Sequence, residues 1–425
     1  MAKISEVNAI QVFDSRGVPT ISCKITLDNG ISASSMVPSG ASTGSKEALE
    51  LRDNEESYHG KGVLKAVTNI KNKLKPLILG INPINQLEID QILIDFDGTE
   101  DKSNIGANSI LAISLAISHA AAKDQNIDLH EHFLNLYKNI TGDSIKPSIP
   151  MPMFNILNGG EHANNNIDIQ EFMIIPKGAK NFSEIMKWSS EIYHNLKNIL
   201  QTKGFSSSVG DEGGFAPNLE SNEEAIKLII EAITSSGLKP GIDVSIALDC
   251  AASEFFDGKN YVLKSENKKL SSPEFTNYLK ELVNKYPITS IEDAMDENDL
   301  DGWKLITEEL GEKCQLVGDD LFVTNKKILI EGIQKKLANS ILIKFNQVGT
   351  ITETIQTIHS ANIHKIKSVI SHRSGETEDT TIADLAVGLG VGQIKTGAPC
   401  RSDRIAKYNR LLWIESESSN ILLNE

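Results

Sequence analysis

Charged residues recur at the ends of short apolar runs in the second half of the sequence. The runs are SIALDC, ITSIED, CQLVGDD, SILIKFN, SVISHRS and GQIKTG, and the residues at their ends are Asp249, Glu292, Asp319, Lys344, His372 with Arg373, and Lys395. The intervals between these positions are 43, 27, 25, 28 and 23 residues. A single charged strand end often only solvates the strand terminus, but six in succession indicate a shared site.

Three of these positions are carboxylates. Asp249, Glu292 and Asp319 would repel one another if the fold brought them together, unless a cation lay between them. Hard oxygen ligands of this kind favour Mg²⁺. The alternative is three independently salt-bridged acids, and we favour the magnesium site.

The other positions are basic. A lysine that faces a metal and a second lysine has its charged form disfavoured, which predicts a lowered pKa and use as a base. Lys344 or Lys395 could serve in this way, or could instead hold an anion. Arg373 with Ser374 suits a phosphate group, because guanidinium pairs with phosphate oxygens in a fork.

Two polar loops contain further candidates. VGDEGGFAPN places Glu212 in a glycine-rich turn after the strand-like FSSSV, and NGGEHANNNIDIQEFM contains His162, Gln170 and Glu171. A carboxylate in such a turn could act as a general acid with a raised pKa. The Asp-Glu pair could equally only stabilise the turn, and the spacing leaves both alternatives open.

The elements that must position these residues repeat at about 25 residues, the spacing of strand–helix units. Amphipathic segments such as PEFTNYLKELVNKY and TITETIQTIHSAN lie between the apolar runs. Several strand–helix units in series predict a parallel (β/α)8 barrel, in which the carboxyl ends of the strands line one mouth. The charged strand ends would then face a common site.

The first 140 or so residues have a different character. Short strands are expected over 4–35, a Ser/Gly-rich loop over 37–47 and a largely buried helix over 107–123, and the Pro-punctuated KPSIPMPMFN marks a domain boundary. The loop segment GASTGSK is one residue short of a phosphate-binding P-loop, and GxGxxG is absent from the sequence. A nucleotide site is therefore weakly supported.

Composition restricts the class of protein. The chain has 425 residues, with 42 Lys and Arg against 57 Asp and Glu, giving a net charge of −15 that argues against broad nucleic-acid or membrane-surface binding. Four dispersed cysteines indicate a reducing compartment. We expect no signal peptide and no membrane span, and hence a cytoplasmic enzyme.

Taken together, the motifs resemble those of the enolase family in its bacterial form. The matching segments are DSRG at Asp14, SGASTG, NGGEHA, QEF, VGDEGG, SIED, DDLFVTN, LIKFNQ, SHRSGETED and GQIKTGAPCRSDRIAKYN. The resemblance implies an α/β fold, a modified (β/α)8 TIM-like barrel (141–425) with a smaller α+β N-terminal capping domain (1–140). It implies a glycolytic carbon–oxygen lyase, a phosphopyruvate hydratase that reversibly dehydrates 2-phospho-D-glycerate to phosphoenolpyruvate.

The resemblance also implies roles for individual residues. Lys344 would take the C2 proton, and Glu212 would protonate the departing C3 hydroxyl. Glu171 and His162 complete the catalytic set. The substrate-binding residues would be Gln170, Arg373, Ser374, Lys395 and His372. Asp249, Glu292 and Asp319 would hold the first Mg²⁺, and Ser42 a second that arrives with substrate. A Lys or His base working with one or two Mg²⁺ ions is a known property of the enolase superfamily and not an inference from these residues.

Departures from the family pattern concern assembly more than chemistry. The segment DSRGVPTIS has Val18 and Ser22 where the family usually has Asn and Glu near the dimer contact. We expect a homodimer or a higher homo-oligomer, with no direct nucleic-acid binding. The alternatives are another superfamily reaction on an unphosphorylated acid, which the SHRSGETED and GASTG motifs disfavour, and an additional non-catalytic role at the cell surface, after secretion without a signal peptide, or in an RNA-degrading complex.

Overall fold

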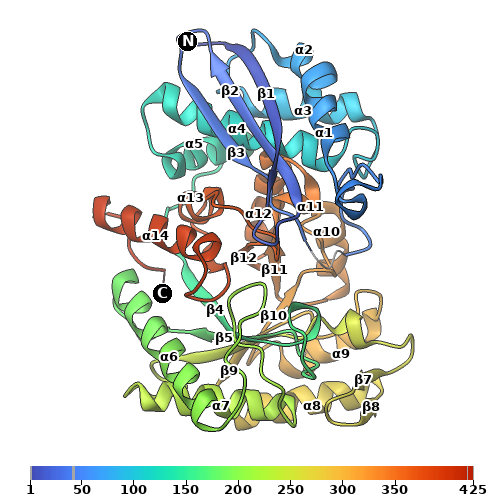
Figure 1. Cartoon of the computed structure of the whole chain (residues 1–425), viewed down its shortest axis with the longest axis vertical. Coiled ribbons are helices and arrows are strands. Elements are labelled where there is room, and N and C mark those ends of the chain that lie inside the picture. The colour runs from blue at the N-terminus through green and yellow to red at the C-terminus, as the bar shows by residue number, and fades with distance from the viewer. Residues whose placement is uncertain (1, 41–43, 419, 425) are drawn as a thin grey trace.

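The structure, a computed structural model, describes residues 2–40, 44–418 and 420–424 (Figure 1). The N-terminal part, at the top of Figure 1, combines a three-stranded sheet with helices, and a closed barrel with its surrounding helices lies below it. Residues 142–150, which connect the two parts, contain no helix or strand. This architecture confirms the fold class expected from the sequence.

The N-terminal sheet is antiparallel in the order β1-β2-β3. Its strands are β1 (Ile4–Phe13), β2 (Pro19–Leu27) and β3 (Ser32–Met36). The helices that follow are η1 (Ser57–Gly60), α1 (Leu64–Asn69), η2 (Ile70–Leu74), α2 (Lys75–Ile78), α3 (Gln86–Asp97), α4 (Ala107–Gln125) and α5 (Leu129–Thr141). Helix α4 packs against β2 and β3, and 15 of its 19 residues are buried, which explains its nearly continuous apolar and small-residue sequence.

Eight strands close the barrel in the order β10-β11-β12-β13-β4-β5-β6-β9. They are β4 (Met151–Asn158), β5 (Glu171–Ile175), β6 (Ser245–Asp249), β9 (Ile288–Glu292), β10 (Gln315–Gly318), β11 (Ser340–Ile343), β12 (Lys367–Ser371) and β13 (Gly392–Lys395). Strand β5 runs antiparallel to both neighbours, and every other pair is parallel. The first barrel unit is therefore irregular, which fits the modified barrel that the resemblance implies.

Helices surround the barrel and connect its strands (Figure 1). They are α6 (Phe182–Thr202), α7 (Asn222–Ser235), α8 (Ser272–Lys285), α9 (Leu300–Leu310), α10 (Lys326–Lys335), α11 (Phe345–Val348), α12 (Ile351–Ile363), α13 (Thr381–Gly388) and α14 (Ser402–Glu417), with the short η3 (Gly160–His162) and η4 (Ala252–Phe255) and the hairpin β7 (Tyr261–Leu263) and β8 (Lys268–Leu270). Local signals set helix starts: Ser271 and Glu274 form a capping box at α8, and the Thr350 side chain caps α12.

One local expectation was wrong. The segment 205–209, FSSSV, forms no strand, and only Val209 makes an isolated bridge, to Phe215. The segment is largely exposed and pairs with no strand, so its backbone groups form no row of hydrogen bonds with a neighbouring strand. The turn that follows is closed instead by the Gly210 N–H, which donates to the Gly214 carbonyl at 2.8 Å.

None of the helices in the described part of the chain combines the length and the apolarity that crossing a membrane requires.

Candidate active site

The carboxyl ends of parallel barrel strands and the start of the antiparallel β5 meet at a small cavity of about 30 Å³. Eleven of the thirteen residues singled out in the sequence line it: His162, Gln170, Glu171, Glu212, Asp249, Asp319, Lys344, His372, Arg373, Ser374 and Lys395. Glu292 is buried behind this lining and contacts it through Lys395. Ser42 lies outside the described residues. The fold thus gathers residues spread over more than 230 positions of the chain, from His162 to Lys395.

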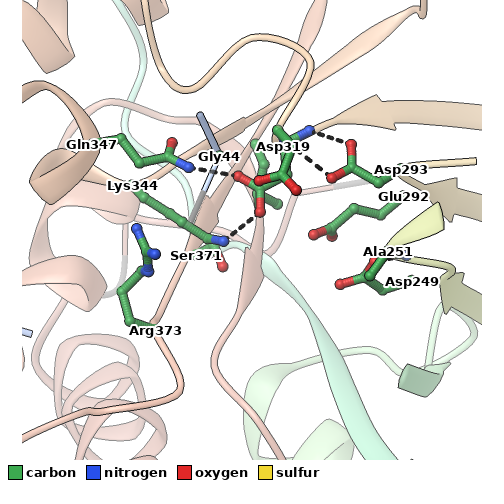
Figure 2. Close-up of polar contacts among 12 residues, drawn as sticks. Gly44, Asp249, Ala251, Glu292, Asp293, Asp319, Lys344, Gln347, Ser371 and Arg373 are labelled. Atoms are coloured by element: carbon green, nitrogen blue, oxygen red, sulfur yellow. Dashed lines mark hydrogen bonds and ion pairs between the residues drawn. The ribbon is translucent and has the colours of Figure 1, made fainter. Parts of the chain in front are cut away.

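Asp249 and Glu292 end neighbouring parallel strands and stand opposite each other in the register, and Asp319 follows β10 directly. All three are at least 93% buried, with exposed fractions of 4%, 1% and 7%. Figure 2 shows their carboxylates facing one region. Burial, and then the Asp249 carboxylate, raise the pKa of Glu292 well above its usual value. Negative charge here is concentrated beyond what the nearby protein cations neutralise.

Lys395 projects into this acidic group. Its Nζ lies 2.8 Å from Glu292, 3.2 Å from Asp249 and 3.3 Å from Glu171, and the side chain is 3% exposed. Burial opposes its charged form, but the three carboxylates outweigh burial and raise the pKa of Lys395 well above its usual value. Lys395 is therefore a fixed positive charge and is unsuited to the role of base.

Lys344 follows β11 and forms an ion pair with Asp319 (Figure 2). The Gln347 Nε2 donates to the other Asp319 oxygen at 2.8 Å. Burial favours a neutral lysine, but the Asp319 carboxylate outweighs burial and raises the pKa of Lys344. The lowered pKa expected from the sequence concerns a lysine that faces a bound cation, whereas the Asp319 carboxylate that the fold places at Nζ shifts the pKa in the opposite direction.

A second group at the mouth consists of two carboxylates and two imidazoles. The His162 Nδ1 lies 3.5 Å from Glu171 Oε1 and 3.6 Å from Glu212 Oε1, and the His372 Nε2 lies 3.4 Å from Glu212 Oε2. The Asn155 amide also donates to Glu212, at 2.9 Å. The glycine-rich turn therefore presents Glu212 to the site and does more than stabilise itself.

The two carboxylates of this group titrate in opposite directions. Burial and the Glu212 carboxylate raise the pKa of Glu171 well above its usual value. Burial alone would raise the pKa of Glu212 as well, but the imidazoles of His162 and His372 hold it well below the usual value. The pKa of Glu212 is therefore shifted in the direction opposite to the raised value considered for a general acid in the turn, whereas the neutral form of Glu171 is favoured.

Arg373 is held by residues of the loop before the N-terminal helices. Its Nη1 lies 2.9 Å from the Glu47 carboxylate, and Glu47 also accepts hydrogen bonds from the Gly44 N–H at 3.1 Å and from the Gln347 amide at 3.2 Å. Gly40 lies so close that a Cβ there would be 1.9 Å from the Arg373 Nη2. The N-terminal part thus supplies an anion, Glu47, where the sequence suggested a phosphate.

The sequence analysis missed four acids at this site: Glu254, Asp293 and Asp320, which line the cavity, and Glu47. Asp293 accepts the backbone N–H groups of Asp319 and Asp320 at 2.9 and 3.0 Å (Figure 2), and Glu47 contacts Arg373. Burial and Asp320 raise the pKa of Asp293, and burial and Asp319 raise that of Asp320 to about 8. Asp293 and Asp320 each follow a singled-out acid directly, which was the available signal, whereas nothing local marks Glu47.

The donor set at this mouth fits a hard divalent cation. The buried carboxylates supply only oxygen ligands, and the pKa of Glu292 is raised by its acidic neighbour as well as by burial. Within the described part of the chain, two groups bring one ligand atom from each member within 4.8 Å of the others: Asp293, Asp319 and Asp320, and His162, Glu171 and Glu212. Asp319 is thus shared between the expected triad and a tighter acidic group, and both are suited to Mg²⁺.

Comparison with protein families gives two matches along the chain. Residues 4–133 match the family model described as enolase, N-terminal domain. Residues 146–422 match the model described as enolase, C-terminal TIM barrel domain. The two matches together include nearly all of the chain and, in the second, every residue of the cavity described above.

Proposed function

The chain belongs to the enolase family, and from that premise we propose that this enolase-type lyase reversibly dehydrates 2-phospho-D-glycerate to phosphoenolpyruvate with Mg²⁺. The observation that carries the proposal is the single cavity in which buried carboxylates, two lysines and Arg373 meet at the barrel mouth. The substrate is a phosphorylated acid, so it presents anionic groups to the cations and a C2 proton to a base. An unphosphorylated acid would leave Arg373 without a partner on the substrate.

Lys344 is the proposed base for the C2 proton. Its pKa is raised while Asp319 is its partner, so Asp319 must be drawn away, by a cation or by another donor, before the neutral amine is accessible. Arg373 and Ser374 would bind the phosphate, and Gln170, whose Oε1 has no hydrogen-bond partner among the described residues, would contact the substrate. Lys395, as a fixed cation, would stabilise negative charge that develops on the substrate carboxylate.

Glu212 is the proposed acid for the C3 hydroxyl, with Glu171 as its proton reservoir. Because the pKa of Glu171 is raised and that of Glu212 is lowered, Glu171 is the proposed holder of the proton before the reaction. His162 Nδ1 lies within 3.6 Å of both carboxylates and is placed to relay that proton. His372 would hold the orientation of Glu212 from the other side.

Asp249, Glu292 and Asp319 are the proposed ligands of the first Mg²⁺. A divalent cation there supplies positive charge beside the substrate carboxylate, where charge accumulates as the C2 proton leaves. The second Mg²⁺, arriving with substrate, is assigned to the loop that contains Ser42. The protein's own contribution is to hold the carboxylates buried and pre-oriented on strand ends.

We further propose the domain division at 140/141, a homo-oligomeric assembly and a cytoplasmic location, with a role at the cell surface or in an RNA-degrading complex as an additional activity. Exposed apolar side chains on and beside β1 support the proposed homo-oligomer. Phe13 and Tyr58 form an edge-to-face ring pair 5.9 Å apart and are 54% and 46% exposed, and Ile10 on the same strand is 54% exposed. Apolar side chains this exposed are suited to burial against another copy.

The first experiment follows the ultraviolet absorbance of phosphoenolpyruvate formed from 2-phosphoglycerate. We expect turnover with Mg²⁺, its loss on adding EDTA and its return with excess Mg²⁺, because the carboxylate group requires a hard cation. Folding is monitored by circular dichroism throughout. A folded, Mg²⁺-loaded sample without turnover would contradict the proposed substrate and direct attention to other acids.

Glu47→Gln is expected to lower KM for 2-phosphoglycerate by about three- to tenfold, because the Glu47 carboxylate competes with the substrate phosphate for Arg373. Gln preserves the shape of the side chain and should leave kcat within about twofold. Glu55→Gln, an exposed acid of the same region, is the control and should change neither constant. A rise in KM for Glu47→Gln would show instead that Glu47 orients Arg373 for binding.

A further inference from the structure

A larger cavity, of about 1220 Å³, lies at the opposite end of the barrel. Its lining includes the first residues of four strands, Met151 of β4, Gln315 of β10, Lys367 of β12 and Gly392 of β13. The same strands β12 and β13 end at Ser371 and Lys395 in the active-site cavity. The two cavities are thus separated by the length of a strand, roughly 13 Å at 3.3 Å per residue, and nothing in the proposed reaction uses the larger one.

Lysines dominate the charge of this cavity. Five of them, Lys177, Lys180, Lys313, Lys365 and Lys367, line it, against a single acid, Glu312. All five are exposed, and none forms an ion pair with a residue of the described chain. Some other surface lysines of the barrel pair with acids, as Lys280 does with Glu309 at 2.6 Å. The lining thus has a local excess of about four positive charges in a chain whose net charge is −15.

The lysines stand on loops or, in the case of Lys367, at the start of β12, and hydrogen bonds hold these segments in place. The side chain of Asn339 donates to the carbonyls of Gly311 and Cys314 at 2.9 and 3.1 Å and so fixes the loop that contains Lys313. The Lys367 N–H donates to the Asn339 carbonyl at 3.2 Å. Gly178, between Lys177 and Lys180 in the chain, donates to the carbonyl of Asp243 at 2.9 Å. A pre-organised frame lowers the entropic cost of binding an anion.

The rest of the lining combines apolar side chains with amide and hydroxyl groups. Ile175, Val391, Leu422 and Leu423 contribute aliphatic surface, and the Gln315 amide donates to Gln393 at 2.8 Å across the strand starts. Small-molecule sites typically combine such apolar walls with a few polar groups that fix orientation. An inorganic anion would use the lysines but leave the apolar wall without a partner.

From these observations we propose that this cavity is a second ligand site, for an organic polyphosphate: a small molecule with several phosphate groups for the lysines and a less polar body for the aliphatic wall. Multiple phosphates suit ammonium groups spread over three loops, since one monophosphate could reach only some of them. Because the site lies at the other end of the barrel, its ligand does not compete with the substrate for Arg373 or Lys344.

The test measures binding of ATP and of inorganic tripolyphosphate to the full chain by calorimetry, without Mg²⁺ so that the probes stay unchelated. Wild type is compared with Lys313→Ala/Lys367→Ala, which removes two lining lysines. The matched control, Lys71→Ala/Lys73→Ala, removes two exposed lysines of the N-terminal part. Arg373→Ala removes the phosphate-binding group of the active site and so separates the two cavities.

We expect one ATP per chain, binding that weakens on the order of tenfold in the Lys313/Lys367 variant, and no change in the Lys71/Lys73 or Arg373 variants. ATP should bind more tightly than tripolyphosphate, and added salt should weaken both. The proposal is overturned by the absence of saturable binding, by equal losses in the two double-lysine variants, or by a loss confined to Arg373→Ala. Equal affinities for ATP and tripolyphosphate would overturn the claim that the ligand has an organic body that contacts the aliphatic wall.

Discussion

Lys344→Ala is expected to abolish exchange of the substrate C2 proton with solvent, with kcat falling by roughly 10⁴-fold, because general-base contributions reach about this size. Lys344 is the only lysine among the described lining residues other than Lys395, and Lys395 is held charged by three carboxylates. Substrate binding should remain largely intact, since Arg373 and Lys395 persist. The measurement is loss of deuterium from C2-labelled 2-phosphoglycerate, followed by NMR alongside turnover.

Folding must be separated from chemistry in this experiment. Removing Lys344 leaves Asp319 with Gln347 as a remaining donor, and breaking a buried ion pair costs about 3–5 kcal/mol. The melting temperature of the variant is therefore recorded with and without Mg²⁺, and Lys335→Ala, an exposed lysine at the end of α10, serves as the control. Persistent C2 exchange in a folded Lys344→Ala protein would exclude Lys344 as the base.

Glu212→Gln is expected to lower dehydration by roughly 10²–10⁴-fold while C2 exchange continues, because the acid acts after the proton has left C2. Glu171→Gln should show the same separation to a smaller degree, because it removes the reservoir of the proton and not the group that delivers it. Both rates are measured on the same samples, exchange by NMR and dehydration by absorbance.

The Glu212→Gln variant must stay folded for the two rates to be compared. The isosteric amide keeps the acceptor that the Asn155 side chain uses at 2.9 Å, so local structure should survive in Glu212→Gln. Glu220→Gln, an exposed acid eight residues away in the sequence, is the control. Simultaneous loss of both rates in folded Glu212→Gln would contradict the stepwise division between base and acid.

Much of the fold follows from local sequence. The apolar runs that end at Asp249, Glu292 and Lys395 form strands that end at these residues, because a short continuous apolar run between amphipathic helices suits a barrel strand that is buried on both faces. Caps such as Ser271 with Glu274 mark where α8 begins. The expectation of a strand at 205–209 was wrong because a strand must form hydrogen bonds with a partner strand. Whether such a partner is present cannot be read from the local sequence.

Most of the residues that form the site could also be predicted from the sequence. Parallel strands carry their carboxyl ends to one mouth, so residues at successive strand ends converge whatever the details of packing. Asp293 and Asp320 could have been added as the second acid of each acidic strand end. Glu47 could not, because its contact with Arg373 joins residues 326 positions apart and arises from the docking of the N-terminal part on the barrel.

The sequence by itself determined the barrel, the order of acids and bases around its mouth and the resemblance to a family, because these depend on residue types and on periods along the chain. Only the tertiary structure decided the direction in which each pKa is shifted. A pKa depends on burial and on charges within a few ångströms, so Asp319 raises the pKa of Lys344, burial raises that of Glu171, and the imidazoles of His162 and His372 lower that of Glu212. The lysine-lined cavity has the same origin, since its charges come from three loops that only the closed barrel brings together.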